Sequence, residues 1–149
     1  MIKLLVVSDV HGDSSSLNLL YLYNQDFDYY LDLGDSCLMP YEIAPFVSVK
    51  GNNDYGYNYP PSRVIHTKYG DIYLEHGNHY IDEEYILSKN ALIFLSGHTH
   101  KRYFYQIDDK HYVANPGSLS RPRDNNYGTY LVITIDENDV NFSFKEFKE

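Results

Sequence analysis

Aspartate, asparagine and histidine side chains follow directly on the apolar runs of this chain of 149 residues. Four apolar residues at positions 4–7 lead to Asp9 and His11. Four later runs end in side chains of the same types: Asp35, Asn52, His76, and His98 with His100. A buried carboxylate or imidazole is costly unless a partner satisfies it, and a divalent cation would satisfy both kinds of group. The sequence therefore predicts a metal site built from strand ends.

The types of these seven side chains restrict the metal. Asp-x-His and His-x-His place both side chains on the same face of an extended segment. Four imidazoles, two carboxylates and one amide oxygen exceed the needs of one catalytic ion with an open position, but they suit two ions that share a carboxylate. Mixed nitrogen and oxygen donors favour manganese, our first choice, or iron, zinc, nickel or cobalt, over calcium or magnesium. Two such ions about 3.5–4 Å apart can activate a bridging water and neutralise phosphoryl oxygens.

The hydrophobic pattern predicts the elements that position these residues. It predicts strands over 4–7, 29–33, 46–49, 64–69, 72–75, 92–95, 103–107, 112–114, 129–135 and 140–147. It predicts helices from 13 or 14 to about 24, over 40–44 and over 82–90. Turn signals stand at Gly70-Asp71, Asp108-Asp109 and Glu137-Asn138. Strand–helix–strand units followed by hairpins predict an α/β layered fold with two sheets in a single domain, 1–149, with the site at the carboxyl ends of the strands.

The composition excludes several classes of function. A net charge of −9, with only 12 lysines and arginines, argues against a large nucleic-acid footprint. Bound cations would then supply the positive charge that a phosphate-bearing substrate needs. The lack of a long apolar segment predicts no membrane span, and the single cysteine, Cys37, predicts a reducing, cytoplasmic location. The 17 tyrosines, among them the alternating Tyr55, Tyr57 and Tyr59, leave room for a homo-oligomer contact, a cavity wall or ordinary packing.

Five short blocks together resemble the calcineurin-like metallophosphoesterases, from residue 4 to about residue 135. The blocks are Asp9-x-His11, Gly34-Asp35, Gly51-Asn52-Asn53-Asp54, His76-Gly77 and Gly97-His98-Thr99-His100. The compact length, the segment Asn115-Pro116-Gly117-Ser118 and Pro122-Arg123 are similar to the small bacterial and archaeal phosphodiesterase branch of that superfamily. Single blocks occur widely by chance, but five in this order are specific.

The resemblance implies a fold and a division of the ligands. The fold would be a four-layer α/β arrangement, a two-sheet β-sandwich flanked by helices. One ion would be held by Asp9, His11 and His100. The second ion would be held by Asn52, His76 and His98, and Asp35 would bridge the two. Hydroxide held between the two ions would then attack the phosphorus.

The chain departs from the family pattern at Asn53 and in the block His76-Gly77-Asn78-His79, where relatives often show His-Gly-His. Many members carry a histidine where Asn53 stands, and a neutral amide has no pKa near 7 with which to protonate a leaving group. We therefore expect Asn53 to hydrogen-bond a phosphoryl oxygen. Either the enzyme favours esters with good leaving groups, or another acid protonates the leaving group, with His79 as the candidate. Arg123 either clamps the substrate phosphate or pairs with an acidic neighbour. Asp54 either caps backbone N–H groups of its loop or supports a metal ligand.

These features predict a phosphodiesterase that hydrolyses small phosphodiesters through two metal ions. A phosphomonoesterase or a protein phosphatase is an alternative, although the chain lacks a long insertion that would build a peptide groove. A non-catalytic protein-binding scaffold is another, since the resemblance extends to a eukaryotic retromer subunit with a degraded metal site. A degenerate scaffold would be expected to lose an imidazole or the bridging carboxylate, whereas this chain keeps all seven positions.

Overall fold

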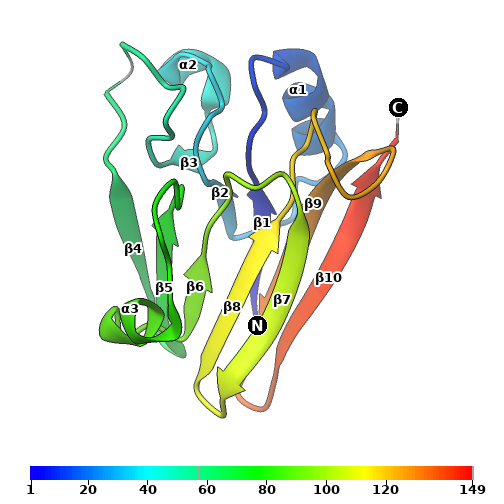
Figure 1. The fold of residues 1–149 in the computed structure, drawn as a ribbon. Coiled ribbons are helices and arrows are strands. Elements are labelled where there is room, and N and C mark those ends of the chain that lie inside the picture. The colour runs from blue at the N-terminus through cyan, green and yellow to red at the C-terminus, as the bar shows by residue number, and fades with distance from the viewer. Residues whose placement is uncertain (57, 149) are drawn as a thin grey trace.

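Two mixed β-sheets of five strands each form the centre of the computed structural model, which describes residues 1–56 and 58–148 (Figure 1). The first sheet contains, in spatial order, β10 (Val140–Phe147), β9 (Gly128–Ile135), β1 (Ile2–Val7), β2 (Tyr29–Asp32) and β3 (Val47–Ser48). The second contains β4 (Ser62–Thr67), β5 (Gly70–Glu75), β6 (Ile93–Leu95), β8 (His111–Pro116) and β7 (Arg102–Asp108).

β1 lies in the middle of the first sheet because its side chains are apolar on both faces. Leu4, Leu5, Val6 and Val7 are all fully buried. The strand pairs in parallel with β2 and antiparallel with β9, as Figure 1 shows. The parallel half of the sheet and the C-terminal hairpin therefore meet at β1, and its carboxyl end lies at the centre of one edge of the sheet.

In the described part of the chain, three helices pack on the outer faces of the sandwich: α1 (Ser14–Leu22), α2 (Pro40–Ile43) and α3 (Glu83–Ser88). α1 begins at Asp13, whose carboxylate accepts a hydrogen bond from the backbone N–H of Ser16. Its Leu17 and Leu20 pack in one hydrophobic cluster with residues of β1 and α2. α3 is capped by the Asp82 side chain and packs on the outer face of the second sheet.

The largest hydrophobic cluster lies between the two sheets. It includes Leu4 and Val6 of β1, Leu74 of β5, Leu95 of β6 and Leu131 of β9. Alternate residues of β1, such as Leu5 and Val7, face α1 instead, as expected for successive side chains of a strand. The layers therefore run helix, sheet, sheet, helix, which confirms the predicted four-layer α/β class.

The predicted element order is confirmed, but two turns lie elsewhere than the sequence indicated. Thr67 pairs with Gly70 in the β4–β5 hairpin, so the turn is Lys68–Tyr69 and Gly70 already begins β5. The Thr67 hydroxyl fixes this turn because it donates to the carbonyl of Gly70 and accepts from the N–H of Tyr69. The β7–β8 turn is shifted by one residue, to positions 109–110.

The three alternating tyrosines do not share one role. Tyr59 is buried, packs in the cluster beneath α1, and donates a hydrogen bond to the carbonyl of Leu38. Tyr55 is 80% exposed, and Tyr57 lies outside the described residues. Ordinary packing therefore accounts for Tyr59.

None of the helices in the described part of the chain has both the length and the apolar character needed to cross a bilayer.

From the core between the sheets we predict how the truncation of one buried side chain, far from the metal-ligand loops, changes the stability of the protein. Leu131 is fully buried in this core, so Leu131→Ala should lower the free energy of unfolding by about 2–5 kcal/mol. Leu22→Ala, at a side chain 61% exposed in α1, should change it by less than about 0.5 kcal/mol. Urea unfolding followed by circular dichroism measures both, and equal losses would contradict this placement of the core.

Candidate metal centre

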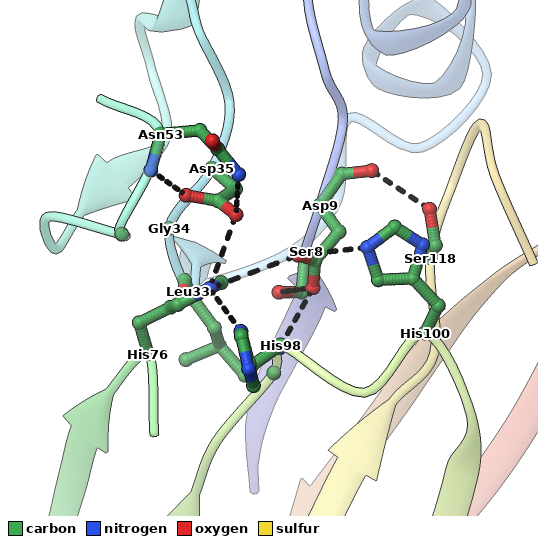
Figure 2. A network of polar contacts seen from close by, with 12 residues as sticks. Ser8, Asp9, Leu33, Gly34, Asp35, Asn53, His76, His98, His100 and Ser118 are labelled. Carbon is green, nitrogen blue, oxygen red and sulfur yellow. Dashed lines mark hydrogen bonds and ion pairs between the residues drawn. The ribbon is translucent and has the colours of Figure 1, made fainter. Parts of the chain in front are cut away.

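The predicted ligands come together at one edge of the sandwich. β1, β2 and β3 run parallel in the first sheet, and β5 and β6 run parallel in the second. The loops after these strands carry the seven ligand positions: Asp9 and His11, Asp35, Asn52, His76, and His98 with His100. Figure 2 shows side chains from both sheets converging on one point. Residues far apart in the sequence thus share one site.

The first group of ligand atoms comes from Asp9, His11 and His100, all within 4.8 Å of one another. The Nε2 atoms of His11 and His100 are 3.3 Å apart. Oδ1 of Asp9 lies 3.3 Å from Nε2 of His100 and 3.8 Å from Nε2 of His11. These separations are those of neighbouring ligands on one ion with metal–ligand bonds of about 2.0–2.2 Å.

The second group consists of Asp35, His76 and His98. Oδ2 of Asp35 lies 3.2 Å from Nε2 of His76, which is 3.3 Å from Nδ1 of His98. Nε2 of His76 is also 3.8 Å from Oδ1 of Asp9. The two groups are therefore adjacent, and Asp9 lies at the contact between them.

One oxygen of Asp9 provides the test of whether a cation fits this site. Oδ2 of Asp9 accepts hydrogen bonds from the Ser8 hydroxyl and the backbone N–H of His98. Oδ1 is buried and has no hydrogen-bond partner within the described residues, although imidazole nitrogens surround it. A buried charged oxygen without a partner is costly. A divalent cation between Oδ1 and these nitrogens would remove that cost, so the residues fit a metal ion.

Hydrogen bonds on the far side of two imidazoles select the tautomer that a metal requires. Nδ1 of His76 faces the carbonyl of Leu33 at 2.7 Å, and Nδ1 of His100 faces the carbonyl of Arg121 at 2.7 Å. A carbonyl only accepts, so each Nδ1 carries a proton, and Nε2 is the nitrogen left to bind a metal when the imidazole is neutral. Nε2 of His100 lies 3.3 Å from Oδ1 of Asp9, and Nε2 of His76 lies 3.8 Å from the same atom.

The electrostatics of the site also favour metal-binding protonation states. Burial lowers the pKa of His11 and that of His98, so both imidazoles are neutral near pH 7, the form that binds metal. Burial alone would raise the pKa of Asp35, but hydrogen bonds from His76 and Asn53 hold it well below its usual value. In the absence of metal, the same contact with Asp35 raises the pKa of His76 against the effect of its burial.

Asp54 ties the second and third ligand loops together. Its carboxylate accepts backbone hydrogen bonds from Asp35 (2.8 Å), Gly51 (2.7 Å) and Cys37 (2.9 Å). Of its two predicted roles, capping of backbone N–H groups is confirmed. The loops approach so closely that a Cβ on Gly51 would lie 2.2 Å from Oδ1 of Asp35. Glycine is therefore required beside Asn52.

A cavity of about 420 Å³ opens over both ligand groups. Four of the ligand residues line it, together with two asparagines and two arginines: His11, Asp35, His98, His100, Asn52, Asn53, Arg121 and Arg123. Asn52 and Arg123 thus reach the cavity as the sequence suggested. Asn53 donates from both its backbone N–H and its side-chain amide to Asp35, at 2.7 and 2.8 Å, so its amide hydrogen faces a ligand.

Arg121 is a cavity residue that the sequence reasoning missed. It lies near enough to His11 for its charge to help lower the pKa of that imidazole. The signal was present, because Arg121 and Arg123 flank one proline shortly after the Asn115–Ser118 segment. Within the described residues, neither guanidinium forms an ion pair with a carboxylate. Both charges are available for an anionic ligand.

His79 is the predicted site residue that the structure does not bring to this cavity. It lines a separate hollow of about 280 Å³. There Nε2 contacts the buried carboxylate of Glu75 at 2.5 Å, and Nδ1 faces the carbonyl of Tyr80 at 2.9 Å. Both partners are acceptors, so both nitrogens carry protons, and these contacts raise the pKa of His79. Its proton is engaged by Glu75, and the geometry does not support His79 as an acid at the metals.

A family comparison agrees with this fold and site. The model of the calcineurin-like phosphoesterase superfamily domain matches residues 2–138. The chain therefore belongs to the calcineurin-like phosphoesterase superfamily. A probable metallophosphoesterase of Methanothermobacter thermautotrophicus is 34% identical over 89 residues, which are 54% of this chain and 51% of that protein. The chain thus spans about half the length of the curated relative that it matches.

Solved structures share the whole fold. A conserved protein of Streptococcus pneumoniae TIGR4, described as a predicted phosphoesterase, has a TM-score of 0.85 and 28% identity over 97% of this chain and 89% of its own. An archaeal phosphodiesterase has a TM-score of 0.74 at 18% identity, covering 97% of this chain and 100% of its own. A single mutant of Vps29 from Entamoeba histolytica has a TM-score of 0.74 at 23% identity, covering 99% and 100%. The last two show the fold alone.

Asp32 is a further buried aspartate near the site, and one of its oxygens lacks a hydrogen bond in the part of the chain that the structure describes. Asp32 ends β2 and is fully buried, and its Oδ2 accepts from the Ser48 hydroxyl at 2.6 Å. Its Oδ1 has no hydrogen-bond partner within the described residues. Burial, together with the charges of Asp54 and Asp9, raises the pKa of Asp32 from 3.8 to about 7, although the bond from Ser48 opposes the change.

Asp32→Asn should therefore flatten the pH profile of stability. Between pH 3.8 and about 7 the native state of the metal-free protein binds more protons at Asp32 than the unfolded chain does. The free energy of unfolding then falls as pH rises through this window, and the amide should remove that part of the fall. Urea unfolding at several pH values measures it. Asp26→Asn, at an exposed aspartate paired with Lys3, is the control, and parallel profiles for Asp32→Asn and wild type would contradict the prediction.

Proposed function

We propose that this protein is a metal-dependent phosphodiesterase that hydrolyses small phosphodiesters with two divalent ions, manganese being the first choice. The observation that carries the proposal is the pair of adjacent ligand groups, with Oδ1 of Asp9 between them and without a hydrogen bond from the described residues. Four residues of these groups line a cavity that also contains two arginines. Membership of the superfamily supports a phosphoester hydrolase.

The two ions would divide the ligands as the resemblance implies. Asp9, His11 and His100 would hold one, and the other would be held by Asn52, His76 and His98, with Asp35 shared. When bound, two ions supply water activation and charge neutralisation at the phosphoryl oxygens. In the structure Asp35 contacts His76 directly, so its bridging position stays a prediction.

The chain's own residues would bind and orient the phosphate. Arg121 and Arg123 line the cavity without carboxylate partners within the described residues, and guanidinium groups bind phosphate oxygens in bidentate geometry. Asn52, which is exposed beside them, would complete the second ion's ligands. The cavity of about 420 Å³ is of the size that holds a small molecule, and the net charge of −9 disfavours a long polyanion.

A protein-binding scaffold is the second candidate, because Vps29 shares this fold. Fold alone does not assign function, so the site must separate the two. All seven ligand positions are kept, and buried hydrogen bonds orient two of the imidazoles. A scaffold has no need for this order.

Removal of metal should separate these two functions. Purified protein treated with a chelator and then dialysed should lose at least about 100-fold in the rate of hydrolysis of a chromogenic phosphodiester, because charge neutralisation by ions contributes several kcal/mol to such a transition state. Added Mn²⁺ should restore the rate. Activity unchanged by the chelator would exclude the metal mechanism, and no activity with any divalent ion on mono- or diesters would favour the scaffold.

The two cavity arginines should act on substrate binding more than on turnover. Arg121→Gln and Arg123→Gln should each raise KM for the chromogenic diester about 10-fold, because each removes a charge-assisted hydrogen bond worth about 1.5–3 kcal/mol, with a smaller change in kcat. Lys68→Gln, which removes one positive charge in the β4–β5 turn away from the cavity, is the control for net charge. Steady-state kinetics measures all three, and unchanged KM values at both arginines would remove them from the substrate site.

A further inference from the structure

The segment Asn115–Arg123, which we call the brace, begins with the last two residues of β8 and lies against the first ligand group. The Ser118 hydroxyl donates to the carbonyl of Asp9 at 2.7 Å, as Figure 2 shows. The Ser120 hydroxyl donates to the carbonyl of Val10 at 2.7 Å. The brace thus fixes both peptide groups between Asp9 and His11.

The brace also connects Asp9 to His100 by a continuous chain of hydrogen bonds. The oxygen of the Ser118 hydroxyl, which donates to Asp9, accepts from the backbone N–H of Arg121 at 2.8 Å. The carbonyl of Arg121 then accepts from Nδ1 of His100 at 2.7 Å. A second bond runs from the N–H of Arg123 to the carbonyl of His100 at 3.0 Å. One short segment therefore sets the backbone of His100 and the direction of its ring.

The first ligand group needs such support because its backbone is strained. Asp9, His11 and His100 have φ values of 52°, 48° and 63°. For residues other than glycine this left-handed region costs about 1–3 kcal/mol and persists only where the surroundings hold it. Ser118 is fully buried, so its hydroxyl has no water to replace the bonds that it makes.

The brace does not support the second group to the same degree. Among the described residues, Asp35 and Asn52 form no hydrogen bond with it, and neither does His76. Their loops are held instead by Asp54 and by the carbonyl of Leu33. The exception is the loop that carries both His98 and His100, where the Asn115 amide donates to the carbonyl of Gly97 at 2.9 Å.

We propose that Ser118 and Ser120 are positioning residues that set the metal affinity of the Asp9–His11–His100 group, and leave that of the second group largely unchanged. The hydroxyls touch no ligand atom directly. They act by holding the strained backbone that aims the carboxylate and the two imidazoles at one point. The inference rests on the metal site of the proposed function, and substitutions that act through a ligand's supporting hydrogen bonds typically change metal affinity 10–100-fold.

The test is a titration of metal-free protein with Mn²⁺, with free Mn²⁺ followed by electron paramagnetic resonance. Wild type should bind two ions. Ser118→Ala and Ser120→Ala should each weaken the binding of one ion at least about 10-fold and the binding of the other less than about 3-fold. Ser120→Thr keeps the hydroxyl at a partly exposed position, and this variant should bind both ions as wild type does. Ser48→Ala is the matched control, because Ser48 is also a buried serine whose hydroxyl donates to an acceptor outside the first group, Asp32.

A second readout needs no metal and covers the case in which Ser118→Ala fails to fold. In metal-free protein the imidazole proton on Nδ1 of His100, bonded to Arg121, should give a slowly exchanging downfield NMR signal in wild type, Ser120→Thr and Ser48→Ala. It should exchange faster in Ser120→Ala, and faster still or not appear in Ser118→Ala.

The outcomes distinguish this inference from the function on which it rests. Three results would each contradict the proposed role of Ser118 and Ser120: equal weakening of the binding of both ions, unchanged Mn²⁺ binding in the two alanine variants, or the same loss of affinity in Ser48→Ala. A wild-type protein that binds no Mn²⁺ would overturn the proposed function with manganese, while the NMR signal would still decide whether Ser118 and Ser120 hold His100 in place.

Discussion

One buried oxygen, Oδ1 of Asp9, accepts no hydrogen bond from the described residues, and it is the constraint on which the site depends. It follows β1, whose residues 4–7 are fully buried, and lies within 3.8 Å of imidazole nitrogens from three separate loops. Without a hydrogen bond, the buried charge destabilises the protein. The fold therefore keeps an unfavourable arrangement in place, and a cation at this point would turn it into a favourable one.

The two sheets of the sandwich must approach closely to bring the ligand loops together, and glycines permit the approach. A Cβ on Gly97, in the loop after β6 of the second sheet, would lie 1.9 Å from the Ser8 hydroxyl oxygen at the end of β1 in the first. Gly51 is restricted in the same way against Asp35. The glycines of the sequence blocks thus allow ligand loops from different strands to pack at backbone distance.

Buried hydrogen bonds keep the ligand loops in conformations that they would not adopt alone. Asp35 and His98 share the left-handed backbone of the first group, with φ values of 55° and 75°. Asp54 holds the loop of Asp35, and the brace, Asn115–Arg123, holds Asp9 and His100. Geometry fixed before the ligand arrives is what gives a metal site affinity and selectivity. The site is therefore as much a property of these supporting groups as of its ligands.

The sequence by itself determined the order of helices and strands along the chain, the α/β class and the ligand candidates. These follow from local features, since a buried apolar run such as Leu4–Val7 predicts a strand and a polar residue directly after it lies at the strand's end. Six of the ligand side chains meet in two groups, and Asn52 lines the cavity beside them. The predicted position of the β4–β5 turn was wrong. Gly70 suggested a turn at Gly70-Asp71, but the Thr67 hydroxyl fixes the turn two residues earlier.

Only the tertiary structure decided which groups support the ligands and which candidates stand apart from them. Ser118 and Asp9 are separated by 109 positions, and no local pattern indicates that one hydroxyl will meet one particular carbonyl. His79, by contrast, is a residue that the sequence suggested for the site and that the structure places elsewhere. Its type suggested an acid, but its contact with the buried carboxylate of Glu75 holds it in another hollow. Side-chain direction and long-range hydrogen bonding depend on how the two sheets pack, and that packing is a property of the whole chain rather than of any segment.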